Sequence, residues 1–226
     1  MRIAVLGTGA VGRALAGRLA ELGHEVSIGT RDVAATLAQT AVDGMGNQPF
    51  TVWAQAHTQV PLLTFADAAA GAEVVVNATS GTVSLAALTA AGSDNLAGKP
   101  LLDISNPLDF SKGFPPSMSV PDTDSVAERI QAAFPTALVV KTLNTMTATL
   151  MVYPRQLADG DHSAFLSGND AGAKALAREL LESFGHTDII DLGDITTARG
   201  AEMIMPLWLR AMGALGTSIF QFKIVR

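Results

Sequence analysis

The chain has 226 residues, 48% of them hydrophobic, which is enough to bury the core of one domain, alone or with a modest appendage. Its formal net charge is -6, from 15 Lys and Arg against 21 Asp and Glu, and it has no basic run to neutralise the phosphates of a duplex, so we expect no nucleic-acid partner. The chain has no cysteine, which excludes disulfides, thiolate metal ligands and thiol nucleophiles.

Two apolar stretches could be mistaken for targeting or membrane segments. Arg2 precedes the first, but Gly7 interrupts it too early for a signal peptide. The second, an uncharged run after Glu73, contains Asn77 and several hydroxyl residues, so it does not resemble an apolar membrane helix. We therefore expect a soluble cytoplasmic chain with no membrane partner.

The chain begins with a strand, a glycine-rich turn, a helix and a second strand. Residues 2–6 (RIAVL) form an apolar run with strand character, and residues 24–30 (HEVSIGT) form another after Gly23, which we expect to end the helix. Between the two strands, apolar residues recur at helical spacing: Val11, Leu15, Leu19 and Leu22. Such a unit of about 30 residues is typical of a right-handed crossover between parallel strands.

Continuous apolar runs at 73–78, 99–105 and 136–144 predict further parallel strands covered on both faces, with helices starting at 84 and 123. We therefore predict an α/β fold, in which an open, doubly wound parallel sheet of the Rossmann type occupies residues 1–145.

A small C-terminal α/β domain is predicted over residues 146–226. It should hold strands at 162–170 and 186–194, a helix at 173–185 and a final apolar segment at 201–220.

The glycines of GTGAVG lie between a strand and a helix, which is the context in which this spacing indicates a dinucleotide site. Gly7 permits the sharp turn, Gly9 allows the backbone to approach a pyrophosphate, and Gly12 allows the helix to pack closely. The alternative is an accidental glycine turn.

The end of the second strand indicates which coenzyme is bound. An NAD enzyme would carry Asp or Glu there to bind the ribose hydroxyls, whereas this chain has Thr30 followed by Arg31. A hydroxyl and a guanidinium can bind a 2′-phosphate, which favours NADP(H). Two alternatives are that Arg31 is a solvated surface charge and that Asp32 binds the ribose instead.

Candidates for acid–base chemistry are few. The four histidines are expected at surface or capping positions, Tyr153 is the only tyrosine, and Lys141 lies inside an apolar run where a structural role is expected. Hydride transfer between two redox cofactors needs little proton chemistry from the protein, so this scarcity favours such a reaction.

The motifs MRIAVLGTGAVGRALAGRLAELGHEVSIGTRD, EVVVNAT, VVKTLNT and MPLWLRAMGALG together resemble the coenzyme F420-dependent NADP oxidoreductases. They are also similar to the reductase domain of the membrane ferric reductases. The resemblance implies a homodimer in which a Rossmann domain holds NADP(H), a small C-terminal domain covers it, and a hydride passes between nicotinamide C4 and deazaflavin C5.

The resemblance also implies roles for individual residues. The pyrophosphate would be held by Gly7, Thr8, Gly9, Ala10, Val11 and Gly12. The 2′-phosphate would be held by Thr30 and Arg31, and the nicotinamide ribose would lie beside Ala78 and Thr79. Asn144 and Thr145 would lie beside the nicotinamide, with Pro206 and Leu207 facing the second ring, so Asn144 and Leu207 are the candidate catalytic contacts.

Two departures leave the hydride acceptor open between F420 and a flavin, FMN or FAD. The F420-specific relatives have a histidine at the position of Asn144 and a glycine loop one residue longer, and the ferric reductase domains match the asparagine better. Other hypotheses are a small-metabolite dehydrogenase or imine reductase in which Lys141 or Asn144 polarises the substrate, and a sensor of NADP(H) without turnover.

Two further segments have open roles. Phe50 and Trp53, in an insertion-like stretch at 46–62, could cover the adenine or the acceptor, although packing is the simpler expectation. Residues 203–222 carry apolar side chains on more than one helical face, which predicts contact with a second subunit or an acceptor ring unless the segment is a core helix.

Overall fold

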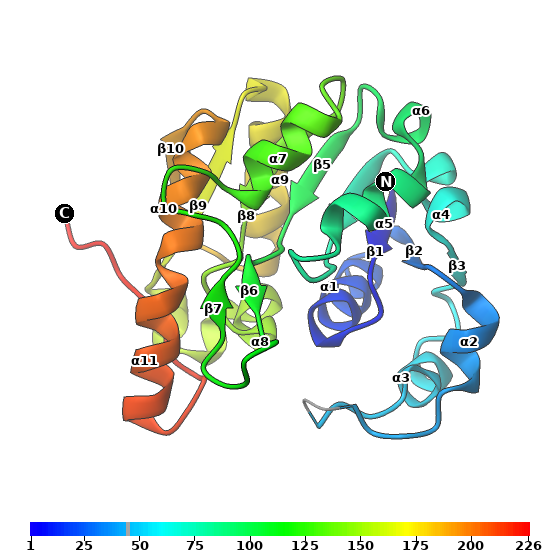
Figure 1. Ribbon diagram of the computed structural model, residues 1–226, viewed down its shortest axis with the longest axis horizontal. Coiled ribbons are helices and arrows are strands. Elements are labelled where there is room, and N and C mark those ends of the chain that lie inside the picture. The colour runs from blue at the N-terminus through cyan, green and yellow to red at the C-terminus, as the bar shows by residue number, and fades with distance from the viewer. Residues whose placement is uncertain (44–45) are drawn as a thin grey trace.

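The computed structural model describes residues 1–43 and 46–226 and shows a central sheet with helices on both faces (Figure 1). In the described residues, eight strands form this sheet in the order β10-β9-β8-β5-β4-β1-β2-β3. Their bounds are Arg2–Leu6 (β1), Glu25–Thr30 (β2), Leu62–Thr64 (β3), Val74–Asn77 (β4), Pro100–Asp103 (β5), Leu138–Thr142 (β8), Ser163–Gly168 (β9) and Asp188–Gly193 (β10). A separate antiparallel hairpin consists of β6 (Leu108–Asp109) and β7 (Ser117–Met118).

The strand order confirms the predicted Rossmann-type sheet. From β1 the chain moves outward through β2 and β3, and from β4 it moves the other way through β5 and β8, with every one of these pairings parallel. The direction therefore reverses between β1 and β4, and ligands of doubly wound sheets bind at such a switch point, outside the carboxyl ends of the strands.

The two C-terminal strands continue this same sheet. β9 pairs with β8 in the antiparallel direction, and β10 pairs with β9 in the parallel direction. The domain boundary at residue 145 remains a prediction.

The helices pack on both faces because the central strands bury alternate side chains in two cores. In β1, Ile3 and Val5 pack into one core with the helices at Ala10–Glu21 (α1), Ala148–Val152 (α8) and Ala171–Phe184 (α9). Ala4 and Leu6 pack into the other core with those at Phe65–Gly71 (α4), Ser84–Ala91 (α5) and Val126–Ala133 (α7).

The helix bounds are Ala10–Glu21 (α1), Val33–Ala38 (α2), Phe50–Ala56 (α3), Phe65–Gly71 (α4), Ser84–Ala91 (α5), Ser93–Leu96 (α6), Val126–Ala133 (α7), Ala148–Val152 (α8), Ala171–Phe184 (α9), Ala198–Met203 (α10) and Met205–Leu215 (α11). Short 3₁₀ helices lie at Pro154–Gln156 (η1), Ala158–Gly160 (η2) and Ile195–Thr197 (η3). Within residues 1–43 and 46–226, no helix combines the length and the apolar character needed to cross a membrane.

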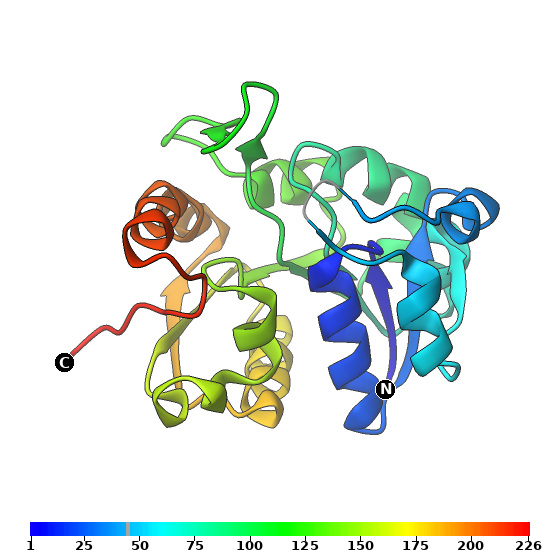
Figure 2. The same cartoon turned by 90° about the horizontal axis from the view of Figure 1, so that it is seen from below.

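The C-terminal helices lie beside the β6–β7 hairpin, on the opposite side of it from α2 and α3 (Figures 1 and 2). Met205, Trp208 and Leu209 are buried, and the hairpin packs against them through Leu108 and Met118. Other apolar side chains of residues 203–222 remain accessible: Leu207 is 59% exposed, Leu215 60% and Ile219 45%. The segment is therefore part core and part exposed apolar surface.

The insertion-like stretch packs against α1 through α3. Phe50 is buried in the same core as Leu15, and the Trp53 ring stacks on His57 with their centroids 4.1 Å apart. Phe50 is therefore a packing residue, in agreement with the simpler expectation.

The expectation that His162 and His186 lie at the surface is wrong, because both are 2% exposed. His186 Nε2 donates to Met151 O (2.9 Å) and His162 Nε2 donates to Pro154 O (3.1 Å). This leaves both Nδ1 atoms buried without a partner among the described residues. Burial lowers the pKa of His186 to about 4, although its hydrogen bond to Met151 opposes the shift.

We expect His186 to make folding sensitive to acid. The unfolded chain takes up a proton near pH 6.5, whereas the folded chain resists protonation until about pH 4, so the free energy of unfolding falls between these values by roughly 3 kcal/mol. Urea unfolding at pH 7.5 and 4.5 should show a smaller fall for His186→Gln than for the wild type. Equal falls in the two proteins would contradict the assignment.

Candidate functional site

The glycine turn brings β1, the start of α1 and the end of β4 into close contact. Gly7 has a φ of +122°, and a Cβ on it would lie 2.7 Å from Ala78 O. A Cβ on Gly12 would lie only 2.0 Å from Gly7 O. Neither position can accept a side chain without a shift of the backbone, so both glycines are needed for the turn itself.

Gly9 has a different environment, because a Cβ built on it would meet no heavy atom within 4 Å. Its φ of -74° is one that any residue can adopt, so the fold does not require glycine there. A glycine that neither the backbone nor the packing demands is consistent with a ligand that approaches the chain at that point.

The amino end of α1 begins at this turn. Gly9 is the N-cap residue and supplies no side-chain cap, and the first turn of α1 has no acidic residue. The first amides of a helix have no partner within the helix, so those of Ala10, Val11 and Gly12 together with the helix dipole favour an anion here.

A pocket of about 300 Å³ lies beside the turn and brings together several of the predicted site residues. Those lining it are Gly7, Thr8, Thr30, Arg31 and Thr79. The rest of the wall comes from Phe65 of α4 and from Val83, Ala86, Ala87 and Ala90 in and before α5. Sequence reasoning missed this apolar wall, because small residues on a helix carry no signal for a ligand.

Arg31 is the cation of this pocket. Its side chain is exposed and makes no hydrogen bond or ion pair with the residues that the structure describes. It therefore remains available for an anionic ligand.

Thr30 and Asp32, the neighbours of Arg31, are less available to a ligand because their side chains already form hydrogen bonds within the protein. Asp32 caps α2, with its Oδ1 accepting from Ala35 N at 2.9 Å, which opposes the alternative that Asp32 binds a ribose. Thr36 Oγ1 donates to Asp32 O (2.7 Å), so the Thr30 hydroxyl must donate its single proton to Thr36 Oγ1 (2.8 Å). A phosphate beside Thr30 would have to compete for that proton.

Thr79 joins the pocket to a buried polar network. Its Oγ1 donates to Asn77 Oδ1 at 2.7 Å and lies 3.0 Å from Ser84 Oγ. Ala78, which precedes it, is the residue whose backbone a Cβ on Gly7 would strike. The end of β4 is thus held from both sides.

Asn144 and Thr145, which follow β8, are buried and do not line this pocket. Leu143 has a φ of +57°, an uncommon conformation for a residue with a side chain and one that is often found at functional sites. Asn144 Nδ2 donates to Asn106 Oδ1 and to Ala201 O, both at 2.9 Å. Its two amide protons are therefore used, and only Oδ1 remains as an acceptor within the described part of the chain.

Lys141 is completely enclosed, as expected for a structural role. Its Nζ lies 2.9 Å from Asp103 Oδ2 and 2.9 Å from Glu202 Oε1, and it also donates to Ser105 O. Burial alone would lower the pKa of Lys141, but the two carboxylates outweigh burial and raise it. The Lys141 ammonium has no free proton and no solvent contact, so it cannot polarise a substrate. Asn144 cannot do so through its amide protons either, because both are donated within the protein.

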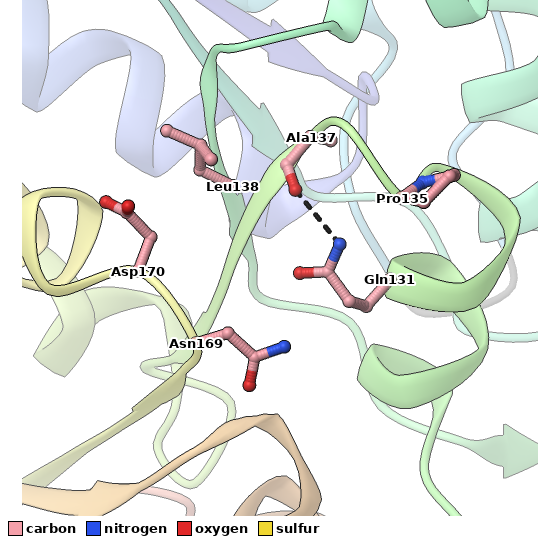
Figure 3. A pocket seen from close by; sticks show the side chains of 6 residues that line it. All are labelled: Gln131, Pro135, Ala137, Leu138, Asn169 and Asp170. Carbon is pink, nitrogen blue, oxygen red and sulfur yellow. Dashed lines mark hydrogen bonds between the residues drawn. The ribbon is translucent and has the colours of Figure 1, made fainter.

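Pro206 and Leu207 lie on α11 and do not reach the pocket beside the glycine turn. A larger hollow of about 380 Å³ contains none of the predicted residues and lies at the start of β8, at the opposite end of that strand from Asn144 (Figure 3). Its Gln131 donates to Ala137 O at 3.0 Å, so this polar side chain is already engaged. In the described residues, no group of three or more His, Cys, Asp or Glu is placed to hold a metal ion.

The sheet has a Rossmann-type fold. Its switch point carries a glycine turn, a helix without a side-chain cap and an arginine with no partner among the described residues, an arrangement typical of dinucleotide-binding proteins. The chain belongs to the coenzyme F420-dependent NADP oxidoreductase family. The family described as NADP oxidoreductase coenzyme F420-dependent matches residues 2–107. The F420-dependent NADP reductase of Methanothermobacter marburgensis is 31% identical over 211 residues, which cover 92% of this chain and 90% of that protein.

Two further proteins are similar to this chain over its full length. A crystal structure of a candidate F420-dependent NADP reductase from Arthrobacter sp. FB24 is 64% identical, with a TM-score of 0.95 and full coverage of both chains. The metalloreductase STEAP3 of Rattus norvegicus is 28% identical over 234 residues, which cover all of this chain but 42% of that protein. The recognised family and the predicted fold are both confirmed.

The glycines predict a contrast between two variants. Gly9→Val should fold normally and lose NADPH binding, because its side chain enters open space that the pyrophosphate would occupy. Gly12→Ala should instead lose about 1–3 kcal/mol of stability, because its Cβ strikes Gly7 O. Thermal unfolding followed by circular dichroism, together with calorimetric titration of NADPH, measures both effects. Normal NADPH binding by Gly9→Val would mean that this turn holds no dinucleotide.

Proposed function

We propose that this protein transfers a hydride between NADPH and the deazaflavin coenzyme F420. The observation that carries the proposal is the pocket beside the glycine turn. It is lined by Arg31, which has no partner among the described residues and follows β2, where doubly wound sheets bind the ribose or its 2′-phosphate. The names of the relatives support F420 as the acceptor and give no support to FMN or FAD.

Each part of the coenzyme has residues suited to it. The pyrophosphate is assigned to the turn at Gly7, Thr8 and Gly9 and to the first amides of α1, at Ala10, Val11 and Gly12. Arg31 pairs with the 2′-phosphate, and Thr30 contributes only if its hydroxyl leaves Thr36. The adenine packs on Val83, Ala86 and Ala90 of the apolar wall.

The nicotinamide is assigned to the ends of β4 and β8, beside Ala78, Thr79, Asn144 and Thr145. Because the amide protons of Asn144 are used within the protein, this residue can offer the nicotinamide carboxamide only an acceptor, Oδ1. When bound, NADPH supplies the hydride from its C4, and the protein orients the two rings and excludes water.

The acceptor ring is assigned to the exposed apolar face of α11 at Pro206 and Leu207, and the same segment is proposed to contact a second subunit in a homodimer. The support is the 59% exposure of Leu207 and 60% exposure of Leu215 on a helix that otherwise packs in a core.

The geometry favours cofactor-to-cofactor transfer over reduction of a small metabolite. Lys141 and Asn144, the two groups that could polarise a substrate, have no proton left to donate. A hydride transfer between two rings needs no such donor.

The direct test of the function is an assay of the purified protein with NADPH and either F420 or FMN as acceptor, followed by absorbance. We expect rapid reduction of F420 and little or none of FMN. Equal rates with both acceptors would contradict the assignment of F420, and no turnover with either would favour a sensor of NADP(H).

Arg31→Ala should separate the two nicotinamide coenzymes. A charge-assisted hydrogen bond contributes about 1.5–3 kcal/mol, so the affinity for NADPH should fall at least about tenfold while that for NADH changes little. Calorimetric titration measures both, and Arg210→Ala, which removes another exposed arginine, is the matched control. An equal loss for NADPH and NADH would show that Arg31 does not contact the 2′-phosphate.

The α11 surface can be tested with two exposed leucines of the same helix. Leu207→Asp should reduce hydride transfer to F420 more than NADPH binding, because a charge would face an apolar ring. Leu215→Asp is the control for effects on assembly, and sedimentation of the wild type should give twice the chain mass of 23.4 kDa. A monomeric wild type with full activity in both variants would remove the case for this surface.

A further inference from the structure

Asp103, Lys141 and Glu202 form a buried charged cluster that joins the sheet to the C-terminal helices. Asp103 ends β5, Lys141 lies in β8 and Glu202 lies in α10, and all three side chains are fully enclosed. The cluster therefore links β8, whose end is assigned to the nicotinamide, and its neighbour β5 with the helix that leads into α11.

The hydrogen bonds of the cluster are complete. Asp103 Oδ1 accepts from Asn77 Nδ2 (2.8 Å) and from Ser105 N (3.2 Å), while its Oδ2 accepts from Lys141. Glu202 accepts from the first amides of α7, Val126 N at 2.9 Å and Ala127 N at 3.2 Å, in addition to Lys141. Two carboxylates face one ammonium, and the helix amides compensate for the remaining negative charge.

A second contact holds α10 against α7. Arg199 forms a two-pronged ion pair with Glu128, with Nε at 2.8 Å from Oε2 and Nη2 at 2.6 Å from Oε1. Glu128 Oε2 also accepts from the Ser125 hydroxyl, and this hydroxyl caps α7 by accepting from Glu128 N. The first turn of α7 therefore fixes α10 at two points.

The cluster also reaches the coenzyme pocket. Asn77, which donates to Asp103, accepts the hydroxyl proton of Thr79, a residue that lines the pocket. On the other side, Asn144 donates to Ala201 O, directly before Glu202 in α10. Thr79 and Asn144, two of the proposed nicotinamide contacts, are thus one or two hydrogen bonds away from the charged cluster.

Such a cluster is poorly explained by stability alone. Removing charges from water is costly, and well-packed apolar residues in the same positions are often as stable as a buried ion-pair network or more so. Hydrogen bonds and ion pairs do, however, depend on direction, so they hold their partners in one relative position, which an apolar contact does not.

We propose that Lys141 is a positioning residue for hydride transfer. Through Asp103 and Asn77, Lys141 holds Thr79 at the nicotinamide ribose. Through Glu202, it holds α10 and the acceptor face of α11 at a fixed distance from the nicotinamide ring. The role rests on the proposed function, because it concerns the distance between hydride donor and acceptor. Lys141 makes no contact with either ring and transfers no proton.

The test uses Glu202→Gln, which keeps the side-chain length but places an amide NH₂ group against the N–H donors that Glu202 accepts from. Lys141→Met is a second and more severe variant. Leu181→Ala, a core change in α9 outside the network, is the control for a general loss of stability. For each protein, thermal unfolding, the affinities for NADPH and for 2′,5′-ADP, kcat with F420, and the isotope effect with NADPH deuterated at C4 are measured.

We expect Glu202→Gln to bind 2′,5′-ADP as the wild type does and to bind NADPH at least threefold more weakly, because the nicotinamide half alone depends on the network. Its kcat should fall at least tenfold and its isotope effect should rise. Lys141→Met should show the same pattern more strongly, and if it does not fold, Glu202→Gln alone decides. A fall in kcat no greater than that of Leu181→Ala, with an unchanged isotope effect, would overturn the proposal.

The binding measurements separate this proposal from the proposed function. If the wild type does not reduce F420, that function fails, and the comparison of NADPH with 2′,5′-ADP still decides the role of Lys141. Selective weakening of NADPH would support the role, and equal changes or no change for both ligands would overturn it.

Discussion

The close approach of three backbone segments at the glycine turn is the constraint on which the site depends. Gly12 comes so near to Gly7 O, and Gly7 so near to Ala78 O, that a methyl group at either position would collide with backbone. Because of this approach, α1 begins beside the carboxyl ends of β1 and β4, where the strand order reverses. An uncapped helix end at that point attracts an anion, and the open space beside Gly9 gives a pyrophosphate room to meet the amides.

The rest of the site is arranged around this turn by polar contacts. The end of β2 presents Arg31 without a partner among the described residues and ties Asp32 into a helix cap, so the local charge favours a phosphate over free ribose hydroxyls. Deeper in the sheet, the partners of Lys141 link β5 and β8 to α10. Enclosed ion pairs therefore join α10 to the central sheet, and α11 packs on the separate β6–β7 hairpin.

Much of this fold can be predicted from the sequence, because its main signals are local. Long apolar runs mark β1, β4, β5 and β8, and the glycine spacing marks the turn and the start of α1. Elements without a local signal were missed: β3 has three residues, β6 and β7 have two each, and their formation depends on neighbours distant in the chain. The antiparallel direction of β9 against β8 likewise depends on contacts between residues distant in the chain.

The same distinction applies to the site. Arg31 follows a recognisable strand, so its place beside the pocket could be predicted, whereas the alanines of α5 that line the same pocket look like any helix surface. The structural role expected for Lys141 was right, but its partners Asp103 and Glu202 are far from it in sequence, and pairing them requires the fold. His162 and His186 were misplaced because nothing in their local sequence indicates that they lie buried against backbone carbonyls.

The position of bound NADP⁺ in crystals of the protein soaked with it would decide whether the pocket beside the glycine turn holds the coenzyme. We expect the pyrophosphate against the amides of α1 at Gly9, the 2′-phosphate within hydrogen-bonding distance of the Arg31 guanidinium, and the nicotinamide beside Thr79 and Asn144. A 2′-phosphate bound away from Arg31, or a coenzyme outside the pocket beside the glycine turn, would contradict this placement.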